Sequence, residues 1–251
     1  MGRMRLPWDI KLRVMWRSFL LQASWNFECM QSLGLVYVLG PALQYLYRDE
    51  ELQAAYQRHL SYFNTHPFMA SPVIGVLLSL EEKQANGEAS ALSADDFKRM
   101  VMAPYAAIGD ALFWGGFRIL AAVVTLFFCI KGFLWAPLVF LLLFNLPHLW
   151  LRLIGFWRGY EVGLRVVDII QKHRLPDIAI LCKEGAVVLA GGLCAYLVVN
   201  CLKTEQIPVI WGLLAIPVML LLGWLSRRGI STLLLGLFCA ALLILLPAVF
   251  S

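Results

Sequence analysis

Nearly unbroken apolar runs fill the chain from residue 117 to residue 251, and they constrain its fold more than any other feature. A helix needs about 20 apolar residues to cross the hydrocarbon core of a bilayer. Five segments approach that length: about 117–130, 133–151, 179–200, 207–225 and 230–250. The first is short, and we expect it to extend backwards through Leu112. Lys131 and Gly132 alone separate the first two segments, which predicts a helical hairpin.

The composition points the same way. Hydrophobic residues make up 61% of the 251 positions, charged residues make up 15%, and the mean hydropathy is +0.74. Average soluble domains contain about 45–50% apolar and about 25% charged residues. These values argue against a water-soluble enzyme, a disordered linker and a nucleic-acid-binding module. The predicted fold class is therefore all-α, a polytopic integral membrane protein.

The two parts of the chain differ in pattern, and we predict a region at 1–116 and a second at 117–251. The second region is expected to hold about five transmembrane spans. The first carries most of the acidic groups and is expected to form amphipathic and broken, re-entrant helices. Residues 14–30 predict an amphipathic or half-inserted helix, and residues 50–63 predict a surface helix.

Two short apolar pieces in the first region are interrupted by proline and glycine. One is residues 73–80, bounded by Pro67 and Pro72, and the other is residues 100–116. Interrupted segments at membrane depth are tolerated only where they are buried in protein or line a wet cavity, so they indicate a transport site. The polar stretch between them, residues 81–99, is expected to be a solvated connection.

The distribution of Lys and Arg predicts the orientation. Residues 152–174 hold five basic residues, and Arg227 and Arg228 occupy the last hairpin turn. The loops at Lys131 and Lys203 hold one basic residue each. We therefore expect the two basic segments and the N-terminal region on the cytoplasmic side, and the C-terminal Ser251 outside.

Polar side chains interrupt the apolar pattern at a few positions. An ionisable group costs about 2.5–3.5 kcal/mol inside a membrane on insertion scales, so such groups are usually functional. Asn64, Thr65 and His66 precede Pro67 and offer both donors and acceptors, which suits a polyhydroxylated ligand such as a sugar. The alternative is a simple helix C-terminus, in which Asn64 and His66 satisfy backbone groups.

The other candidates carry charge. Asp110 is interpreted as a buried carboxylate that binds a sugar hydroxyl or pairs with Arg118, or as the N-cap of the first span. Glu28, near Asn26, is interpreted as an inward carboxylate or as a partner of Arg17.

Lys183 and Glu184 are expected to form a local ion pair with a snorkelling lysine.

Several chemistries lack the residues that they need. No phosphate-binding GxxxxGK[ST] motif and no catalytic triad is present, and cysteines and histidines are scattered. We therefore predict no catalytic nucleophile, no metal site and no cofactor.

At these positions the sequence resembles the IID membrane component of the mannose/fructose/sorbose family of the bacterial sugar phosphotransferase system. The resemblance covers about residues 14–200. The matching stretches are RSFLLQASWNFECMQSLG (17–34), GPALQYLY (40–47), RHLSYFNTHPFMASPVIG (58–75), LEEKQANGE (80–88), MAPYAAIGDALFW (102–114) and RGYEVGL (158–164). The family usually has Met-Gly-Pro-Leu-Ala-Gly where residues 102–107 are Met-Ala-Pro-Tyr-Ala-Ala, so two glycines are lost and a tyrosine is gained. The connection at residues 203–208 is also shorter than in the family.

The resemblance implies an all-helical chain in the bacterial inner (cytoplasmic) membrane that forms a hetero-oligomer with a IIC subunit. Together they would translocate a hexose. The soluble IIB protein would phosphorylate this hexose during import, and IIB would receive its phosphoryl group through IIA. On that basis Asn64, Thr65 and His66 are expected at the sugar pocket, with Asn26, Glu28 and Asp110 as second choices. An alternative function is a non-transporting membrane partner that docks phosphorylated IIA or IIB.

Overall fold

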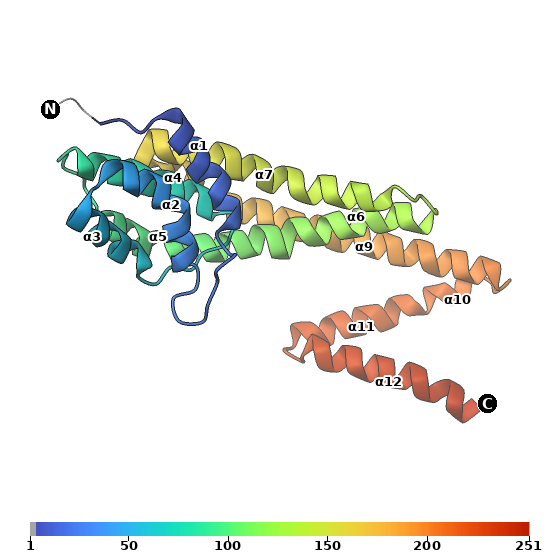
Figure 1. The fold of residues 1–251 in the computed structure, drawn as a ribbon. Helices are drawn as coiled ribbons and strands as arrows, with labels where there is room; N and C mark the ends of the chain where they lie inside the picture. The colour runs from blue at the N-terminus through green and yellow to red at the C-terminus, as the bar shows by residue number, and fades with distance from the viewer. Residues whose placement is uncertain (1–3, 251) are drawn as a thin grey trace. The chain divides into compact units, whose positions relative to one another are not determined.

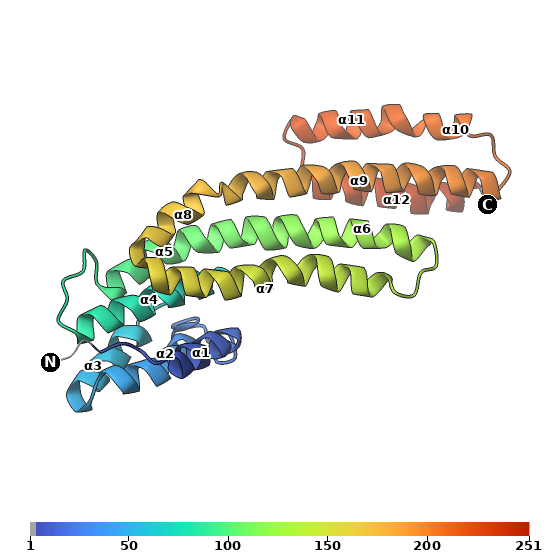
Figure 2. The same cartoon turned by 90° about the horizontal axis from the view of Figure 1, so that it is seen from above.

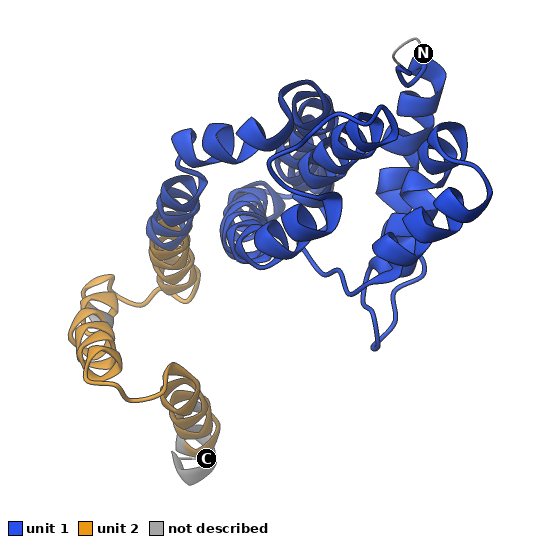
Figure 3. Ribbon diagram, turned by 90° about the vertical axis from the view of Figure 1, so that its left-hand side faces the viewer, with its two compact units in different colours: residues 1–189 blue, residues 190–251 orange. Residues whose placement is uncertain are grey.

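The computed structural model describes residues 4–250, which fold into helices and connecting loops (Figure 1). Within this range the only extended pairing consists of two isolated bridges, Asn26 with Met30 and Met30 with Phe63. The all-helical fold class is therefore confirmed. The chain divides into two compact units, Met1–Leu189 and Ala190–Ser251 (Figure 3). The expected outside placement of Ser251 lies beyond the described residues.

The first unit contains most of the helices, and α9 continues from it into the second unit. Its helices are α1 (Trp8–Arg17), α2 (Ser32–Leu46), α3 (Asp49–Leu60), α4 (Ala70–Ala85), α5 (Ala94–Gly109), the π-helical segment η2 (Asp110–Phe117), α6 (Arg118–Ile130), α7 (Ala136–Val162), α8 (Val166–Lys172) and α9 (Leu175–Thr204), with 3-10 turns at Ser18–Leu20 and Gly163–Arg165. The second unit contains α10 (Ile210–Leu213), α11 (Ala215–Arg227) and α12 (Thr232–Phe250).

The helical hairpin predicted around residues 131–132 is confirmed. After a short turn, α7 runs back along α6, and the two helices pack against each other (Figure 2). The described chain has two helical stretches that are long and apolar enough to cross a membrane, Ala94–Ile130 with 37 residues and Ala136–Thr204 with 69 residues. The surface helix expected at 50–63 is α3, whose first turn carries three acidic side chains that favour a helix N-terminus.

Two predicted elements are wrong. The helix expected over residues 14–30 ends at Arg17 and is followed by a 3-10 turn at Ser18–Leu20. Farther along, Asn26 accepts the backbone N–H groups of Glu28 (3.1 Å) and Cys29 (2.8 Å) and stabilises a local turn in place of a helix. The interrupted piece at residues 100–116 is part of one continuous helix through α5, η2 and α6. Packing outweighs the local cost of Pro104 and the glycines there.

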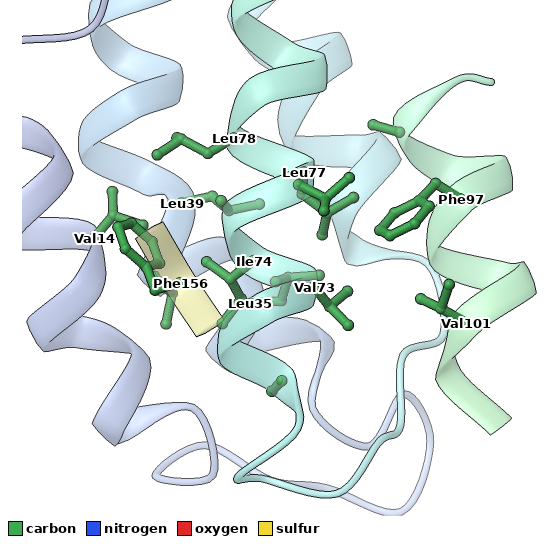
Figure 4. Close-up of a cluster of buried hydrophobic side chains, with 14 of the residues drawn as sticks. Val14, Leu35, Leu39, Val73, Ile74, Leu77, Leu78, Phe97, Val101 and Phe156 are labelled. Atoms are coloured by element: carbon green, nitrogen blue, oxygen red, sulfur yellow. The ribbon is translucent and has the colours of Figure 1, made fainter. Parts of the chain in front are cut away.

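The core of the first unit surrounds α4, whose residues 70–78, 80 and 81 are buried (Figure 4). Its apolar residues pack between those of α1, α2, α5 and α7. The contact between α4 and α7 is the most extensive one between helices. Gly75 makes it possible, since a Cβ there would lie 2.2 Å from the carbonyl oxygen of Phe156. The apolar piece at residues 73–80 is therefore covered by protein on all sides.

Candidate functional site

Two loops from distant parts of the sequence are held together by an amide side chain. Gln31 is 1% exposed, and its Nε2 donates to the carbonyl oxygen of Thr65 at 2.7 Å, while its Oε1 accepts the N–H of Thr65 at 3.1 Å. The backbone N–H of Gln31 also donates to the Phe63 carbonyl at 2.8 Å. The structure thus places the loop of Asn26 and Glu28 beside the loop of residues 61–69. The role of Gln31 is not visible in the sequence, because only the pairing of the two loops reveals it.

His66 is enclosed between the second loop and the continuous helix. Its ring stacks on Phe113 at 5.4 Å between centroids, and a Cβ at Gly109 would lie 2.3 Å from its Cβ. The backbone N–H of Phe68 donates to His66 Nδ1 at 3.2 Å, so we assign the ring hydrogen to Nε2. That nitrogen is buried and has no partner among the described residues. His66 therefore presents an unused donor.

Asp110 lies opposite this donor. Its Oδ1 is 4.0 Å from His66 Nε2, and its side chain is 63% exposed, so the interpretation of Asp110 as a buried carboxylate is wrong. A distance of 4.0 Å is too long for a direct hydrogen bond, but a bridging oxygen can contact both groups. The N-cap interpretation is wrong, because Asp110 has helical dihedral angles (φ −62°, ψ −45°) inside the continuous helix. The guanidinium of Arg118 lies over the Trp114 ring, and no ion pair with Asp110 is found between these described residues.

Asn64 and Thr65 lie beyond the end of α3. The helix ends at Leu60, and Ser61 Oγ donates to the carbonyl of Arg58 at 2.9 Å, so the interpretation of residues 64–66 as a helix C-terminus is wrong. Thr65 is 3% exposed, and its Oγ1 has no partner among the described residues. Asn64 is half-buried. Buried hydroxyl groups are normally hydrogen-bonded, so the free Oγ1 marks a position for a polar ligand or water.

Asn26 and Glu28 have a different setting. The side-chain oxygen of Asn26 is engaged in its own turn, and Glu28 is exposed, so the interpretation of Glu28 as an inward carboxylate is wrong. The expected pairing of Glu28 with Arg17 is not found, because Arg17 Nη1 donates to the Tyr37 carbonyl at 3.0 Å and its guanidinium lies over the Tyr37 ring.

Two residues of α7 that the sequence did not predict at the site support the loop of His66. The ring of His148 stacks on Phe68 at 4.0 Å, with an angle of 12° between the planes. Arg152 is 7% exposed and donates from Nη2 to the Pro67 carbonyl at 3.1 Å. A charged residue that follows a long apolar run was the available signal, but it was interpreted only as an orientation marker.

A second polar cluster lies where the sequence predicted a solvated connection. Glu81 is fully buried and accepts from Arg58 Nη2 (2.8 Å) and Tyr47 OH (2.8 Å), and its Oε1 is 2.9 Å from His59 Nε2. Burial raises the pKa of Glu81, but the hydrogen bonds and charges of His59 and Arg58 outweigh that effect and lower it to about 2. Residues 81–85 belong to α4 and residues 94–99 to α5, where Phe97 and Lys98 are fully buried, so the prediction is wrong for both stretches; the connection is residues 86–93.

Lys183 also differs from expectation. Adjacent residues on a helix do not face each other, and no Lys183–Glu184 ion pair is found in the described part of the chain. The stem of Lys183 instead lies against η2, where a Cβ at Gly115 would be 2.9 Å from its Cε.

The structure combines long apolar helices with a polar site where the loop of His66 meets Asp110 of the continuous helix. These features define an all-helical membrane protein. The chain belongs to the IID components of the mannose/fructose/sorbose family of the PTS, because the model of that family matches residues 9–249. The mannose-specific EIID component of Escherichia coli K12 is 43% identical over 176 residues, which is 69% of this chain and 61% of that protein. The chain therefore matches less than two thirds of that relative. The fructose permease IID component of Bacillus subtilis is 31% identical over 254 residues, covering 90% of this chain and 91% of that protein.

Solved structures have the same fold. One described as the structure of a membrane protein has a TM-score of 0.73 and 31% identity and covers 98% of both chains. A chain of the mannose transporter ManYZ, solved by cryo-EM in complex with microcin E492, has a TM-score of 0.61 and 30% identity and covers 97% of both chains.

Proposed function

We propose that this chain is the IID subunit of a phosphoenolpyruvate-dependent sugar permease in the bacterial inner membrane. It pairs with a IIC subunit, and the pair binds and translocates a hexose of the mannose/fructose/sorbose class, which phosphorylated IIB converts to its phosphate during import. The family match over residues 9–249 supports this assignment. About five spans, a cytoplasmic N-terminal region and an outside C-terminus belong to the same proposal.

The facing pair of His66 and Asp110 is the observation that carries the sugar site. Nε2 of His66 is a donor, the Asp110 carboxylate is an acceptor, and 4.0 Å separates them. A sugar hydroxyl both donates and accepts, so one hydroxyl can bridge the gap. Thr65 Oγ1 and the half-buried Asn64 extend the polar surface. Asn26 and Glu28 lie on the neighbouring loop and complete the proposed pocket or its supporting shell.

The chain supplies binding and no covalent chemistry in this proposal. Neutral and anionic hydrogen-bonding groups orient the sugar, and the phosphoryl group comes from the soluble IIB protein. The test uses vesicles that contain this chain, its IIC partner and the soluble carriers, with a panel of labelled hexoses and phosphoenolpyruvate. We expect phosphorylation of at least one hexose, which disappears when this chain is omitted. An assembled complex that phosphorylates none of them would overturn the proposal and favour a docking role.

Substitutions at the site test the pocket. Asp110→Asn removes the charge but keeps the helix, and a hydrogen bond to a charged group contributes about 1.5–3 kcal/mol, so we expect KM for the sugar to rise about tenfold or more. Asn64→Ala should abolish phosphorylation while assembly with IIC stays intact. Asp168→Asn, on an exposed position of α8, is the matched control and should leave KM unchanged. A wild-type KM in Asp110→Asn would remove Asp110 from the pocket.

A further inference from the structure

A cavity of about 460 Å³ opens between α5, α8 and the beginning of α9, all within the first unit. Apolar side chains form most of its wall: Met100, Val101, Pro104, Ile108, Val167 and Ile170. Its volume lies within the range of about 300–1,000 Å³ that small-molecule sites occupy. The cavity is separate from the loop that carries His66.

A buried hydroxyl in this cavity lacks a partner. Tyr105 lines the cavity and is only 3% exposed, and its OH makes no hydrogen bond among the described residues. Leaving such a group unsatisfied costs free energy, so native proteins normally provide a partner for it. Since the cavity is otherwise mostly apolar, a largely apolar ligand with one polar part would supply the missing partner.

The rim of the cavity carries a cation. Arg174 is 79% exposed, and its Nε contacts Oδ2 of Asp177 at 2.7 Å. A guanidinium has five N–H donors, and this contact engages one of them. Gln171 adds a neutral polar group at the same rim. The wall and the rim together fit a molecule with an apolar chain and an anionic head.

A second cavity lies against α8, which also lines the first cavity. It has a volume of about 340 Å³, shares Ile170 with the first, and is lined by Arg158 and His173 as well as by apolar side chains. Two apolar cavities therefore border α8, and each of them has a basic side chain in its lining. This is the arrangement expected where lipid chains enter between helices below a basic surface.

We propose that the cavity at Tyr105 binds an anionic phospholipid. One acyl chain lies along the apolar wall, the phosphate contacts Arg174, and the Tyr105 hydroxyl donates to an ester or phosphate oxygen. The segment 152–174 is rich in Lys and Arg, which fits the anionic cytoplasmic leaflet. This site is independent of the sugar pocket and rests only on the membrane location of the family.

The test measures binding of a fluorescent phosphatidylglycerol to the full chain purified with its IIC partner and stripped of lipid. We expect saturable binding that phosphatidylcholine vesicles do not displace and phosphatidylglycerol vesicles do. Free glycerol phosphate should not compete, because it lacks the acyl chain. Equal displacement by both vesicle types, or displacement by glycerol phosphate, would overturn the proposal.

Variants locate the site. Arg174→Gln should weaken binding about fivefold, since one basic residue near an anionic surface contributes about 1 kcal/mol. The double variant Arg174→Gln/Asp177→Asn should weaken it equally, which excludes an effect of the unpaired Asp177. Tyr105→Phe should weaken it about threefold, and Tyr105→Trp should block it by filling the cavity. Arg99→Gln, an exposed arginine of α5 outside the cavity, is the matched control. A loss as large in Arg99→Gln, or a photocrosslink from position 105 to the IIC chain in place of lipid, would overturn the assignment.

Discussion

The two units of this protein are stabilised in different ways. The first unit contains a packed core around α4 and fully buried polar residues such as Glu81. In the second unit, Leu193 is the only buried residue among the described side chains. Residues such as Leu220 (69% exposed) and Leu233 (70% exposed) project apolar surface outward. The comparison teaches that the first unit is determined by its own contacts, whereas the second depends on lipid or another subunit to cover it.

The largest expected effect is the loss of the buried carboxylate. Glu81→Ala leaves Arg58 and His59 without their acceptor, and breaking a buried pair costs about 3–5 kcal/mol, so we expect a severe loss of thermal stability in detergent. Glu205→Ala, at an exposed position of the second unit, should be nearly neutral. A Glu81→Ala protein that melts like the wild type would remove the proposed contrast between the units.

Low pH should remove the same contribution of Glu81 to the stability of the first unit. The pKa of Glu81 is lowered from 4.5 to about 2, so its contribution is present above the unfolded pKa and is lost as the pH falls from about 4.5 to about 2. A shift of this size corresponds to about 3 kcal/mol. Thermal melts at stepwise lower pH should show the wild type losing stability faster than Glu81→Gln. Parallel pH profiles for the two proteins would contradict this expectation.

Packing at α4 provides the next test. Gly75→Ala places a Cβ 2.2 Å from the Phe156 carbonyl oxygen and 2.9 Å from the Tyr160 nitrogen, and overpacking costs about 1–3 kcal/mol. At Gly223, in the second unit, a Cβ meets nothing within 4 Å. Gly223→Ala should therefore be neutral or stabilising by up to about 1 kcal/mol. Thermal unfolding of both variants in the same detergent measures the two effects. Equal shifts in melting temperature would contradict the expected difference between α4 and the second unit.

The smallest effect concerns the attachment of α1. Trp8 stacks on Trp157 of α7, with 4.3 Å between ring centroids and 9° between planes. Such a pair contributes about 0.5–1.5 kcal/mol, so Trp8→Ala should lower stability by that amount and speed proteolysis of the N-terminal segment. Trp8→Phe keeps an aromatic ring and should retain most of the stability. If Trp8→Ala is cleaved no faster than Trp8→Phe, the stack does not hold α1.

The sequence predicted best the helices that have a long apolar or amphipathic pattern. The apolar runs around Lys131 fold as the antiparallel pair α6 and α7, and the acidic start of residues 50–63 begins α3. Errors occurred where tertiary contacts outweigh local preference. The chain continues through Pro104 and Asp110 as a helix because neighbouring elements pack against it, and no local pattern reveals such neighbours.

The candidate site shows the same division. The polar residues 64–66 could be selected from the sequence because they interrupt apolar surroundings. Their relation to Asp110 could not, since 44 positions along the chain separate it from His66 and the 4.0 Å approach depends on Gly109 and the loop that Arg152 supports. Gln31 and Glu81 were missed because a polar residue near a loop is usually solvated.

The sequence by itself determined that this is a helical membrane protein of the IID family, because apolar length and specific motifs are local properties that survive without neighbours. Only the tertiary structure decided which polar groups are buried and which face each other. The reason is physical: the cost of burying Glu81 depends on Arg58 and His59, which packing alone brings within hydrogen-bonding range, and packing also sets the 4.0 Å between His66 and Asp110.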